Sequence, residues 1–198
     1  MSKAHREYFN RLAPEWNTTV SDEPMLGDYL HRFGILRGDR VLDIGAGTGR
    51  MTKHLARLVG DDGCVVAEDS ACAMLREGKR VIGNEQPNWL CDDASALALK
   101  DSVFDKVICF STFPHFLDPL AVLKEMYRVL RPGGKLLILH TCSSQQLNEF
   151  HASLEGVVSN DRLPSIQEMI QLLNKTGFVS EETIENDDLY WVKAGKAG

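Results

Sequence analysis

The sequence lacks the features that would mark a nucleic-acid-binding, secreted or membrane protein. Its 198 residues carry a formal net charge of −6 and contain no tract rich in lysine or arginine. Broad electrostatic binding to DNA or RNA needs a basic face, so we do not expect nucleic acid as a partner. No run of about 18 apolar residues occurs, so no segment is expected to cross a membrane. The N-terminal stretch has no apolar run of signal-peptide type, and we expect a cytoplasmic protein.

Cysteine is scarce, and its spacing forms no paired motif. The five cysteines are scattered and odd in number, and the absence of C-x-x-C argues against a zinc ribbon or a thioredoxin-type site. We therefore expect reduced, buried thiols of the kind found in cytosolic proteins. These cysteines are Cys64, Cys72, Cys91, Cys109 and Cys142.

Internal repeats and low-complexity linkers are absent as well, and the length suits one domain with a short appendage. Short apolar runs alternate with longer amphipathic stretches, which is typical of a parallel sheet covered by helices on both faces. The runs expected as strands are 40–45, 64–69, 88–92, 104–110 and 134–141. The stretches expected as helices are 48–59, 71–83 and 119–131.

The two ends of the chain differ from this alternating middle. Residues 1–36 have a helical pattern with an amphipathic start and a break at Pro14. A further helix is expected near 165–176, before two closely spaced runs rich in β-branched and aromatic residues, 178–186 and 188–195. These two runs predict an antiparallel hairpin at the edge of the sheet.

A glycine-rich turn follows the first expected strand, where Gly45, Gly47 and Gly49 come directly behind Asp43. Glycine lets a ligand lie against the backbone, and a helix starting near residue 48 would direct its N-terminus at a carboxylate or phosphate. A dinucleotide site prefers G-x-G-x-x-G, whose sixth position packs a helix closely on a strand. That position is Arg50 here, which argues against a nicotinamide oxidoreductase.

The stretch VLDIGAGTG resembles motif I of the class I S-adenosylmethionine-dependent methyltransferases. Further stretches resemble later motifs of this family in the same order over roughly residues 40–140: VVAEDSACAML, CDDASALALKDSVFDKVICF, FDKVICFSTFPHF and EMYRVLRPGGKLLI. The resemblance implies an α/β fold with a doubly wound, seven-stranded Rossmann-like sheet, mostly parallel with an antiparallel C-terminal hairpin. It also implies S-adenosylmethionine as cofactor and S-adenosylhomocysteine as product.

The resemblance implies roles for individual residues. Asp43 would order the glycine loop near the methionine amino group, and Asp69 would bind both ribose hydroxyls, with Glu68 as its rival. Met74 would lie near the adenine. Asp93 would accept the exocyclic amino group, and Ala94 would offer its backbone N–H. The remaining expected cofactor contacts are Gly45, Ala46, Gly47, Gly49, Ser70 and Phe110.

The stretch EYFNRLAPEWN resembles the N-terminal segment of ubiquinone-biosynthesis-type members, which folds over the cofactor as a lid. Tyr8, Phe9 and Trp16 would then cover the cofactor, or they simply pack the N-terminal helix onto the sheet. We accordingly divide the chain into an N-terminal helical lid, residues 1–36, and an S-adenosylmethionine-binding methyltransferase domain, residues 37–198.

Histidines mark the expected acceptor side. By its position in the family pattern, His115 would be a base or a substrate contact after the fourth strand. His140 ends the next strand, and His151 lies on the inward face of a helix that Ser143 and Gln146 begin as a capping box. With Asp161, these imidazoles are candidates to converge. His140 and His151 would then bind a metal ion or the substrate, or they are ordinary packed histidines.

The resemblance implies a methyltransferase that acts on a small-molecule acceptor of unknown identity. A large substrate domain is absent, so the acceptor is expected to be small or partly enclosed by a partner subunit, for example in a homodimer. Two alternatives stay open. The chain is otherwise an S-adenosylmethionine-binding protein without methyl transfer, or a metal-binding protein on a methyltransferase scaffold.

Overall fold

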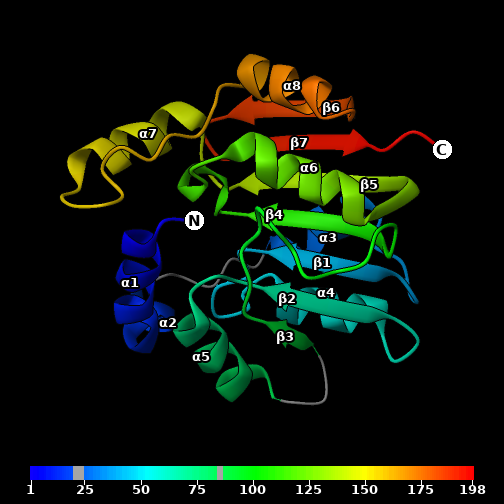
Figure 1. The fold of residues 1–198 in the computed structure, drawn as a ribbon, viewed down its shortest axis with the longest axis horizontal. Coiled ribbons are helices and arrows are strands. Elements are labelled where there is room, and N and C mark those ends of the chain that lie inside the picture. The colour runs from blue at the N-terminus through cyan, green and yellow to red at the C-terminus, as the bar shows by residue number, and fades with distance from the viewer. Residues whose placement is uncertain (20–24, 84–86) are drawn as a thin grey trace.

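The computed structural model describes residues 1–19, 25–83 and 87–198, whose strands form one seven-stranded sheet (Figure 1). The strand order is β3-β2-β1-β4-β5-β7-β6. The strands from β3 to β5 pair in parallel, whereas β7 is antiparallel to both β5 and β6. The strands are β1 (Arg40–Ile44), β2 (Cys64–Glu68), β3 (Asn88–Leu90), β4 (Phe104–Phe110), β5 (Leu130–His140), β6 (Val179–Asn186) and β7 (Leu189–Gly195). The predicted fold class is confirmed, including the C-terminal hairpin.

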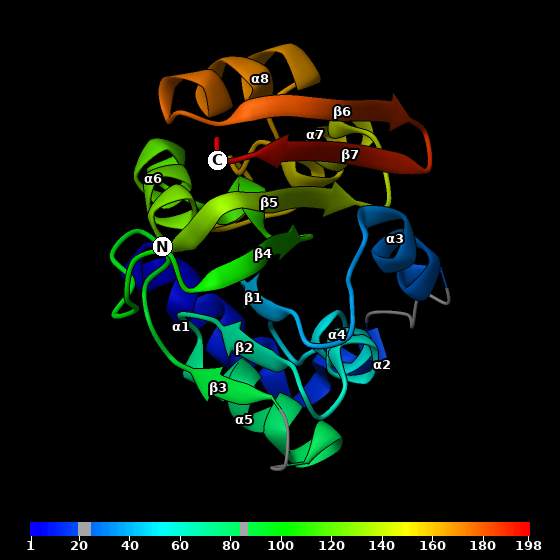
Figure 2. The ribbon, with the colours of Figure 1, turned by 90° about the vertical axis from the view of Figure 1, so that its right-hand side faces the viewer.

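Helices cover both faces of the sheet (Figure 2). The α-helices are α1 (Lys3–Leu12), α2 (Trp16–Thr19), α3 (Leu26–Phe33), α4 (Thr52–Val59), α5 (Cys72–Ile82), α6 (Pro119–Val129), α7 (Ser144–Ser153) and α8 (Ile166–Lys175). Two short 3₁₀ helices, η1 (Ala13–Glu15) and η2 (Phe113–His115), complete the described elements. None of the described helices is long and apolar enough to cross a membrane.

The apolar strands explain why the sheet needs two covers. Successive strand residues point to opposite faces, so Leu136 and Ile138 join a core with α6 and α8, whereas Leu137 and Leu139 join a core with α3 and α4. All four side chains are fully buried. A strand that is apolar at every position has no face that can be left to water.

Some predicted boundaries differ from the observed ones. Helix α4 begins at Thr52 rather than near residue 48, because Gly47 and Gly49 have φ angles of +57° and +85° that no α-helix contains. Strand β5 begins at Leu130, before the expected start at residue 134, and its pairing with β4 shifts register there. The capping box of Ser143 and Gln146 is confirmed at the start of α7.

The first 36 residues contribute in two different ways. Leu26, Leu30 and Phe33 of α3 are buried in the core between the sheet and α4. Helices α1 and α2 lie instead beside α5, at the end of the molecule toward which the parallel strands point (Figure 1). Of the helices in this region, α1 and α2 therefore lie at the carboxyl ends of the parallel strands, where folds of this kind bind ligands.

Candidate active site

The glycine turn after β1 opens onto a cavity. Gly45, Gly47 and Gly49 all have positive φ, a conformation that glycine adopts without a steric penalty. A Cβ at Gly45 would overlap the side chain of Thr112, so this position tolerates no larger residue. A Cβ at Gly47 would meet no atom within 4 Å. The space above Gly47 is therefore open to a ligand that lies against the backbone.

Most of the predicted cofactor residues line this cavity. From β1, β2 and the helices after them come Asp43, Gly45, Ala46, Gly47, Asp69 and Met74. Trp16, Phe110 and His115 line it from other elements. Ser70 and Ala94 line a smaller pocket that adjoins it through Gly45 and Asp69. Gly49 does not face the cavity, because a Cβ there would meet Ile82 and Trp89.

Asp69 accepts hydrogen bonds from the glycine turn and also lines the cavity. Its carboxylate accepts the N–H groups of Gly47 at 2.9 Å and Ala71 at 2.7 Å. Burial raises the pKa of Asp69 to about 6, although these two hydrogen bonds lower it. Its rival Glu68 lines only the smaller pocket, and Oε1 of Glu68 has no hydrogen-bond partner among the described residues. Burial also raises the pKa of Glu68 well above its ordinary value.

Asp43 supplies a second buried carboxylate. Its Oδ2 accepts the Thr52 hydroxyl at 2.5 Å, and its side chain is fully buried at the bottom of the cavity. The pKa of Asp43 is raised to about 7, because burial and the nearby Asp69 raise it by more than the Thr52 hydrogen bond lowers it. Arg50 lines the same cavity as Asp43 and Asp69. The cavity therefore presents both acidic and basic side chains to a ligand.

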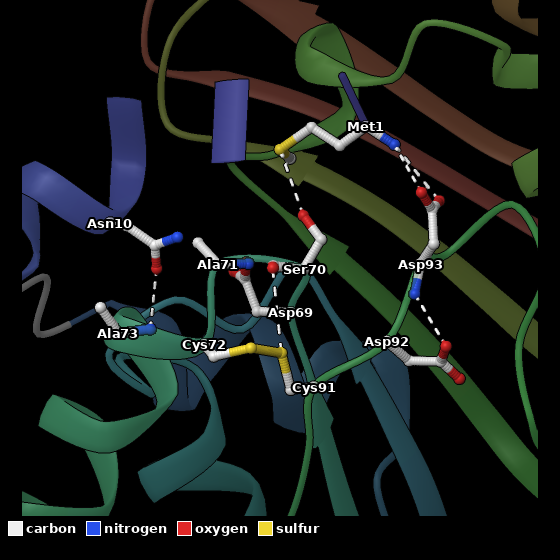
Figure 3. The surroundings of a disulfide bond; sticks show 10 residues. All are labelled: Met1, Asn10, Asp69, Ser70, Ala71, Cys72, Ala73, Cys91, Asp92 and Asp93. Atoms are coloured by element: carbon white, nitrogen blue, oxygen red, sulfur yellow. Dashed lines mark hydrogen bonds and ion pairs between the residues drawn. A yellow bond between two sulfur atoms is a disulfide. The ribbon is translucent and has the colours of Figure 1, made fainter. Parts of the chain in front are cut away.

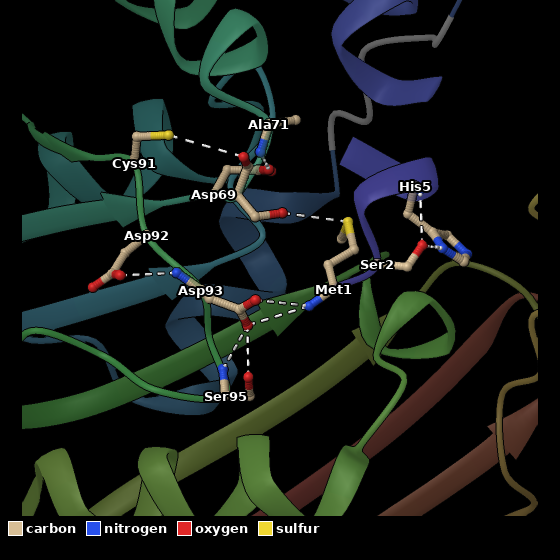
Figure 4. A network of polar contacts seen from close by, with 10 residues as sticks. Met1, Ser2, His5, Asp69, Ala71, Cys91, Asp92, Asp93 and Ser95 are labelled. Carbon is tan, nitrogen blue, oxygen red and sulfur yellow. Dashed lines mark hydrogen bonds and ion pairs between the residues drawn. The ribbon is translucent and has the colours of Figure 1, made fainter. Parts of the chain in front are cut away.

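Asp93 lines a third pocket together with Ser70, and Figure 4 shows its polar contacts. The Met1 amino group donates to both of its carboxylate oxygens at 3.2 Å, and Ser95 donates to Oδ1 through its backbone N–H and its hydroxyl. Partial burial would raise the pKa of Asp93, but the hydrogen bonds from Ser95 and the Met1 amino group lower it. Donors therefore already occupy the carboxylate that was predicted to accept the adenine amino group.

A disulfide joins Cys72 to Cys91 and so links the start of α5 to the loop after β3 (Figure 3). Its Cα atoms are 5.3 Å apart, and it connects the first residue of α5 with the residue after β3. The prediction that all five thiols are reduced and buried is therefore wrong for this pair. Glu68 and Leu90 are partners in the parallel pairing of β2 and β3, so the chain brings the residues just beyond them together. Of the other three cysteines, Cys109 alone is fully buried.

The N-terminal helices close one side of the cavity. The ring of Phe9 packs against Trp16, with 5.9 Å between centroids, and against His115, with 4.9 Å. Asn10 accepts the backbone N–H of Ala73 at 2.8 Å. Tyr8 packs on Phe9 rather than lining the cavity. These contacts agree with either reading of the aromatic residues, as a lid or as simple packing.

A cluster of three histidines gathers around Asp161. Oδ2 of Asp161 lies 2.6 Å from Nδ1 of His115, and Oδ1 lies 2.9 Å from Nε2 of His5. Nδ1 of His151 lies 2.9 Å from the backbone carbonyl of Asp161. Burial would raise the pKa of Asp161, but the hydrogen bonds from His115 and His5 lower it. His5 was not among the predicted site residues; its spacing of four residues from Phe9 was the available signal.

His140 stands apart from this cluster in its contacts. It is buried at the end of β5, where Nε2 has no hydrogen-bond partner among the described residues and the ring packs edge-on against Tyr190. Burial, followed by the nearby His115 and His151, lowers the pKa of His140 to about 3. In the part of the chain that the structure describes, no group of three or more metal-ligand side chains is placed to hold a metal ion. The suggested metal role of His140 and His151 gains no support.

Two cavity residues after β4 also escaped sequence analysis. Ser111 has a φ of +52°, which is uncommon for a residue other than glycine, and it lines the cavity beside Thr112. The backbone N–H of Ser111 donates to the carbonyl of Leu139 at 2.9 Å, which holds this loop against β5. No sequence pattern announces such a conformation, because serine has no preference for it.

Comparison with known proteins finds methyltransferases among the relatives of this chain. A family model described as "Methyltransferase domain" matches residues 42–138. The ubiquinone/menaquinone biosynthesis C-methyltransferase UbiE of Enterobacter sp. (strain 638) is 36% identical over 143 residues, which cover 69% of this chain and 55% of that protein. UbiE of Pasteurella multocida (strain Pm70) is 35% identical over 143 residues, or 52% of its length. The chain thus spans about half the length of these curated relatives.

Solved structures share the fold over nearly the whole chain. A SAM-dependent methyltransferase from Aquifex aeolicus has a TM-score of 0.74 at 22% identity, covering 96% of this chain and 97% of that one. A putative methyltransferase in complex with the Haloferax volcanii Trm112 methyltransferase activator has a TM-score of 0.81 at 18% identity, covering 100% of both chains. At these identities the likeness concerns the fold alone.

Proposed function

The chain belongs to the class I S-adenosylmethionine-dependent methyltransferases, and on that premise we propose that it transfers a methyl group to a small-molecule acceptor. One observation carries the proposal. The open space above Gly47, two buried carboxylates and His115 all border the same cavity. This combination fits a ligand with a diol, a positive charge and a reactive end.

The residues present fit S-adenosylmethionine. The backbone at Gly47 allows the close approach that the cofactor needs, and the carboxylate of Asp69 is suited to accept two ribose hydroxyls. Asp43 would offset the positive charge of the methionine amino group. The cofactor, when bound, supplies a methyl group that its sulfonium already activates.

The remaining cofactor contacts would surround the adenine and the turn. Met74 would pack on the adenine, with Ser70, Ala94 and Asp93 at its edge. Ala46 and Phe110 would border the methionine part, and Gly49 would allow the turn to pack on α5. We restrict the proposed lid to residues 1–19, with Phe9 and Trp16 facing inward, because the side chains of α3 belong to the core.

His115 would act at the acceptor. It borders the same cavity as the glycine turn, where a side chain that accepts a proton would activate a nucleophile. The curated relatives are named C-methyltransferases, which supports a carbon acceptor in a small molecule. The chain's main tasks are then to align that carbon with the methyl group and to exclude water.

Calorimetric titration with S-adenosylhomocysteine tests the cofactor part of this proposal. Wild-type protein should bind it and should not bind NAD, whereas Gly47→Val should fold but lose binding, because its side chain fills the open space above the turn. Equal affinity of the wild type and Gly47→Val would contradict the cofactor site. Production of S-adenosylhomocysteine from S-adenosylmethionine with a library of enols and phenols then tests methyl transfer.

A further inference from the structure

We infer that Asp161 is a positioning residue that holds His115 with Nε2 presented to the cavity as the base, and that His5 joins the N-terminal helix to the same carboxylate. This inference rests on the proposed function, because the base serves an acceptor in that cavity. It assigns a role in the reaction to residues from four separate segments: α1, η2, α7 and the loop before α8.

The carboxylate of Asp161 is almost enclosed by its partners. Its side chain is 9% exposed, against 5% for His5 and 12% for His115. Oδ2 lies 2.6 Å from Nδ1 of His115, and Nε2 of His5 lies 2.9 Å from Oδ1 and 3.1 Å from Oδ2. A carboxylate that is this buried is retained in a protein when its hydrogen bonds are satisfied, and here both of its partners are histidines.

The chemistry of the partners fixes which nitrogen carries a proton. An ionised carboxylate only accepts hydrogen bonds, so Nδ1 of His115 and Nε2 of His5 must be the donors. In a neutral imidazole, one nitrogen donates and the other accepts. With Nδ1 of His115 engaged by Asp161, the lone pair of a neutral ring is on Nε2, and His115 lines the cavity. This is the form that a general base requires.

Two further contacts hold the arrangement in place. Nδ1 of His151 donates to the backbone carbonyl of Asp161, which fixes the loop that carries the carboxylate. Nδ1 of His5 lies 2.6 Å from the hydroxyl of Ser2, which therefore donates to it. The ring of His151 is 5.4 Å from that of His115, and burial lowers the pKa of His151 and of His140. Both neighbours therefore favour their neutral forms, and Asp161 is the charged group beside His115.

This geometry suits an enol or phenol that is methylated on carbon. Its O–H bond breaks, and the proton goes to Nε2 of His115. The electrons released through the conjugated system form the bond between the acceptor carbon and the methyl carbon, while the carbon–sulfur electron pair stays on sulfur and leaves S-adenosylhomocysteine. The ketone that results returns to the enol or phenol as a proton moves from carbon to oxygen, and His115 releases its proton to water.

The same contacts would also suit a purely structural tie between α1 and the loop before α8. Both roles place the proton of His115 on Nδ1, and they differ in whether methyl transfer depends on the lone pair at Nε2. The amide of Asp161→Asn can bridge the same histidines and can donate to Nδ1, which moves the proton of His115 to Nε2. A positioning role then predicts that methyl transfer is lost while S-adenosylhomocysteine binding is kept, whereas a structural tie predicts that both are kept.

Nitrogen-15 NMR of the histidine rings tests this inference on the full chain with S-adenosylhomocysteine bound, at about pH 8, where ordinary imidazoles are neutral. The signals of His115 are assigned from their loss in His115→Gln. The wild type should carry the proton of His115 on Nδ1. Asp161→Asn should carry it on Nε2 and bind S-adenosylhomocysteine within about threefold of the wild type. Asp187→Asn, at an exposed turn, is the matched control and should leave the proton on Nδ1.

Each outcome is decisive. A wild-type His115 with its proton on Nε2 would overturn the inference without any variant, so a poorly folded Asp161→Asn does not leave it open. Wild-type methyl transfer by well-folded Asp161→Asn with the proton of His115 on Nε2 would also overturn it, while intact binding of S-adenosylhomocysteine leaves the proposed function standing. A wild type that does not bind S-adenosylhomocysteine would instead remove the proposed function, on which the role of His115 depends.

Discussion

At the scale of the residue, Asp69 combines a structural and a binding task. Its carboxylate already accepts two backbone N–H groups, from Gly47 and Ala71, and it still has lone pairs that face the cavity. A carboxylate whose pKa lies near 6 is ionised at neutral pH, so it can accept hydrogen bonds from a diol. The residue therefore shapes the glycine turn and is suited to grip the ribose at the same time.

Removal of this carboxylate gives the first prediction. Asp69→Ala should weaken binding of S-adenosylhomocysteine by about 2–4 kcal/mol, because two hydrogen bonds to a charged group are lost and water replaces them in part. Asp69→Asn keeps one accepting oxygen, so its affinity for S-adenosylhomocysteine should lie between those of the wild type and Asp69→Ala. Calorimetry measures both variants beside Asp187→Asn. Wild-type affinity in Asp69→Ala would assign the ribose to another residue, with Glu68 as the next candidate.

Asp43 gives a prediction about pH. Burial raises its pKa from 3.8 to about 7, so between these pH values the folded protein keeps a proton that the unfolded chain releases. The contribution of Asp43 to stability is therefore present below about pH 4 and is lost as the pH rises to about 7. Asp43→Asn cannot titrate, so its stability relative to the wild type should rise over this range.

Urea unfolding of the ligand-free protein at several pH values measures this difference. The comparison with the wild type is needed because His140, whose pKa burial lowers to about 3, changes stability in the opposite direction as the pH falls below about 6.5. Asp187→Asn serves as the control and should show no such trend. A difference between Asp43→Asn and the wild type that stays constant from pH 4 to pH 7 would mean that Asp43 titrates normally.

At the scale of the element, the disulfide ties the two loops that border the cofactor pocket. Cys72 begins α5 directly after the turn of Asp69, and Cys91 precedes Asp92 and Asp93. Because the bond closes a loop between residues 19 positions apart, it restricts the unfolded chain as well as the folded rim. The bond therefore fixes the start of α5 relative to the residue after β3.

Replacement of both cysteines tests the bond. Cys72→Ser combined with Cys91→Ser should lower the free energy of unfolding by about 3 kcal/mol under non-reducing conditions. A reducing agent should destabilise the wild type by a similar amount and leave the double variant unchanged. Thiol titration of the denatured, unreduced wild type should find three free thiols, namely Cys64, Cys109 and Cys142. Five free thiols would show that the bond does not form.

Elements were predictable from the sequence where one local rule decides them. The apolar run before His140 had to be a buried strand, and the two runs around Asn186 had to pair as a hairpin, because their composition allows little else. The start of α4 was placed too early, since positive φ angles at Gly47 and Gly49 override the helical pattern around them. The partners Cys72 and Cys91 were hidden, because only the pairing of β2 with β3 brings them together.

The histidines expected to contact the methyl acceptor show the same limit of prediction from sequence. The family pattern pointed to His115, and helical spacing pointed to the inward side of His151, whereas the link of both to His5 needs four distant segments in one place. Sequence spacing carries no information about such a meeting. Side chains that act through a shared partner are therefore the part of a site that the structure adds.

At the scale of the whole molecule, the carboxyl ends of β1, β2 and β4 meet at one edge of the sheet, and α1 closes over them (Figure 1). The two cores on either side of the sheet hold this edge rigid, because their side chains are buried on both faces. The residues at the strand ends that line the cavity should therefore move little when a ligand binds. Helices α1 and α2 have fewer buried contacts to keep them in place.

A crystal structure of the full chain with S-adenosylhomocysteine tests the central claim most directly. The claim predicts that the ribose hydroxyls lie within hydrogen-bond distance of Asp69, that the methionine part lies over Gly47, and that the sulfur faces the side of the cavity that His115 borders. The same ligand bound elsewhere, or bound with its sulfur turned away from His115, would contradict the account of this cavity as a methyl-transfer site.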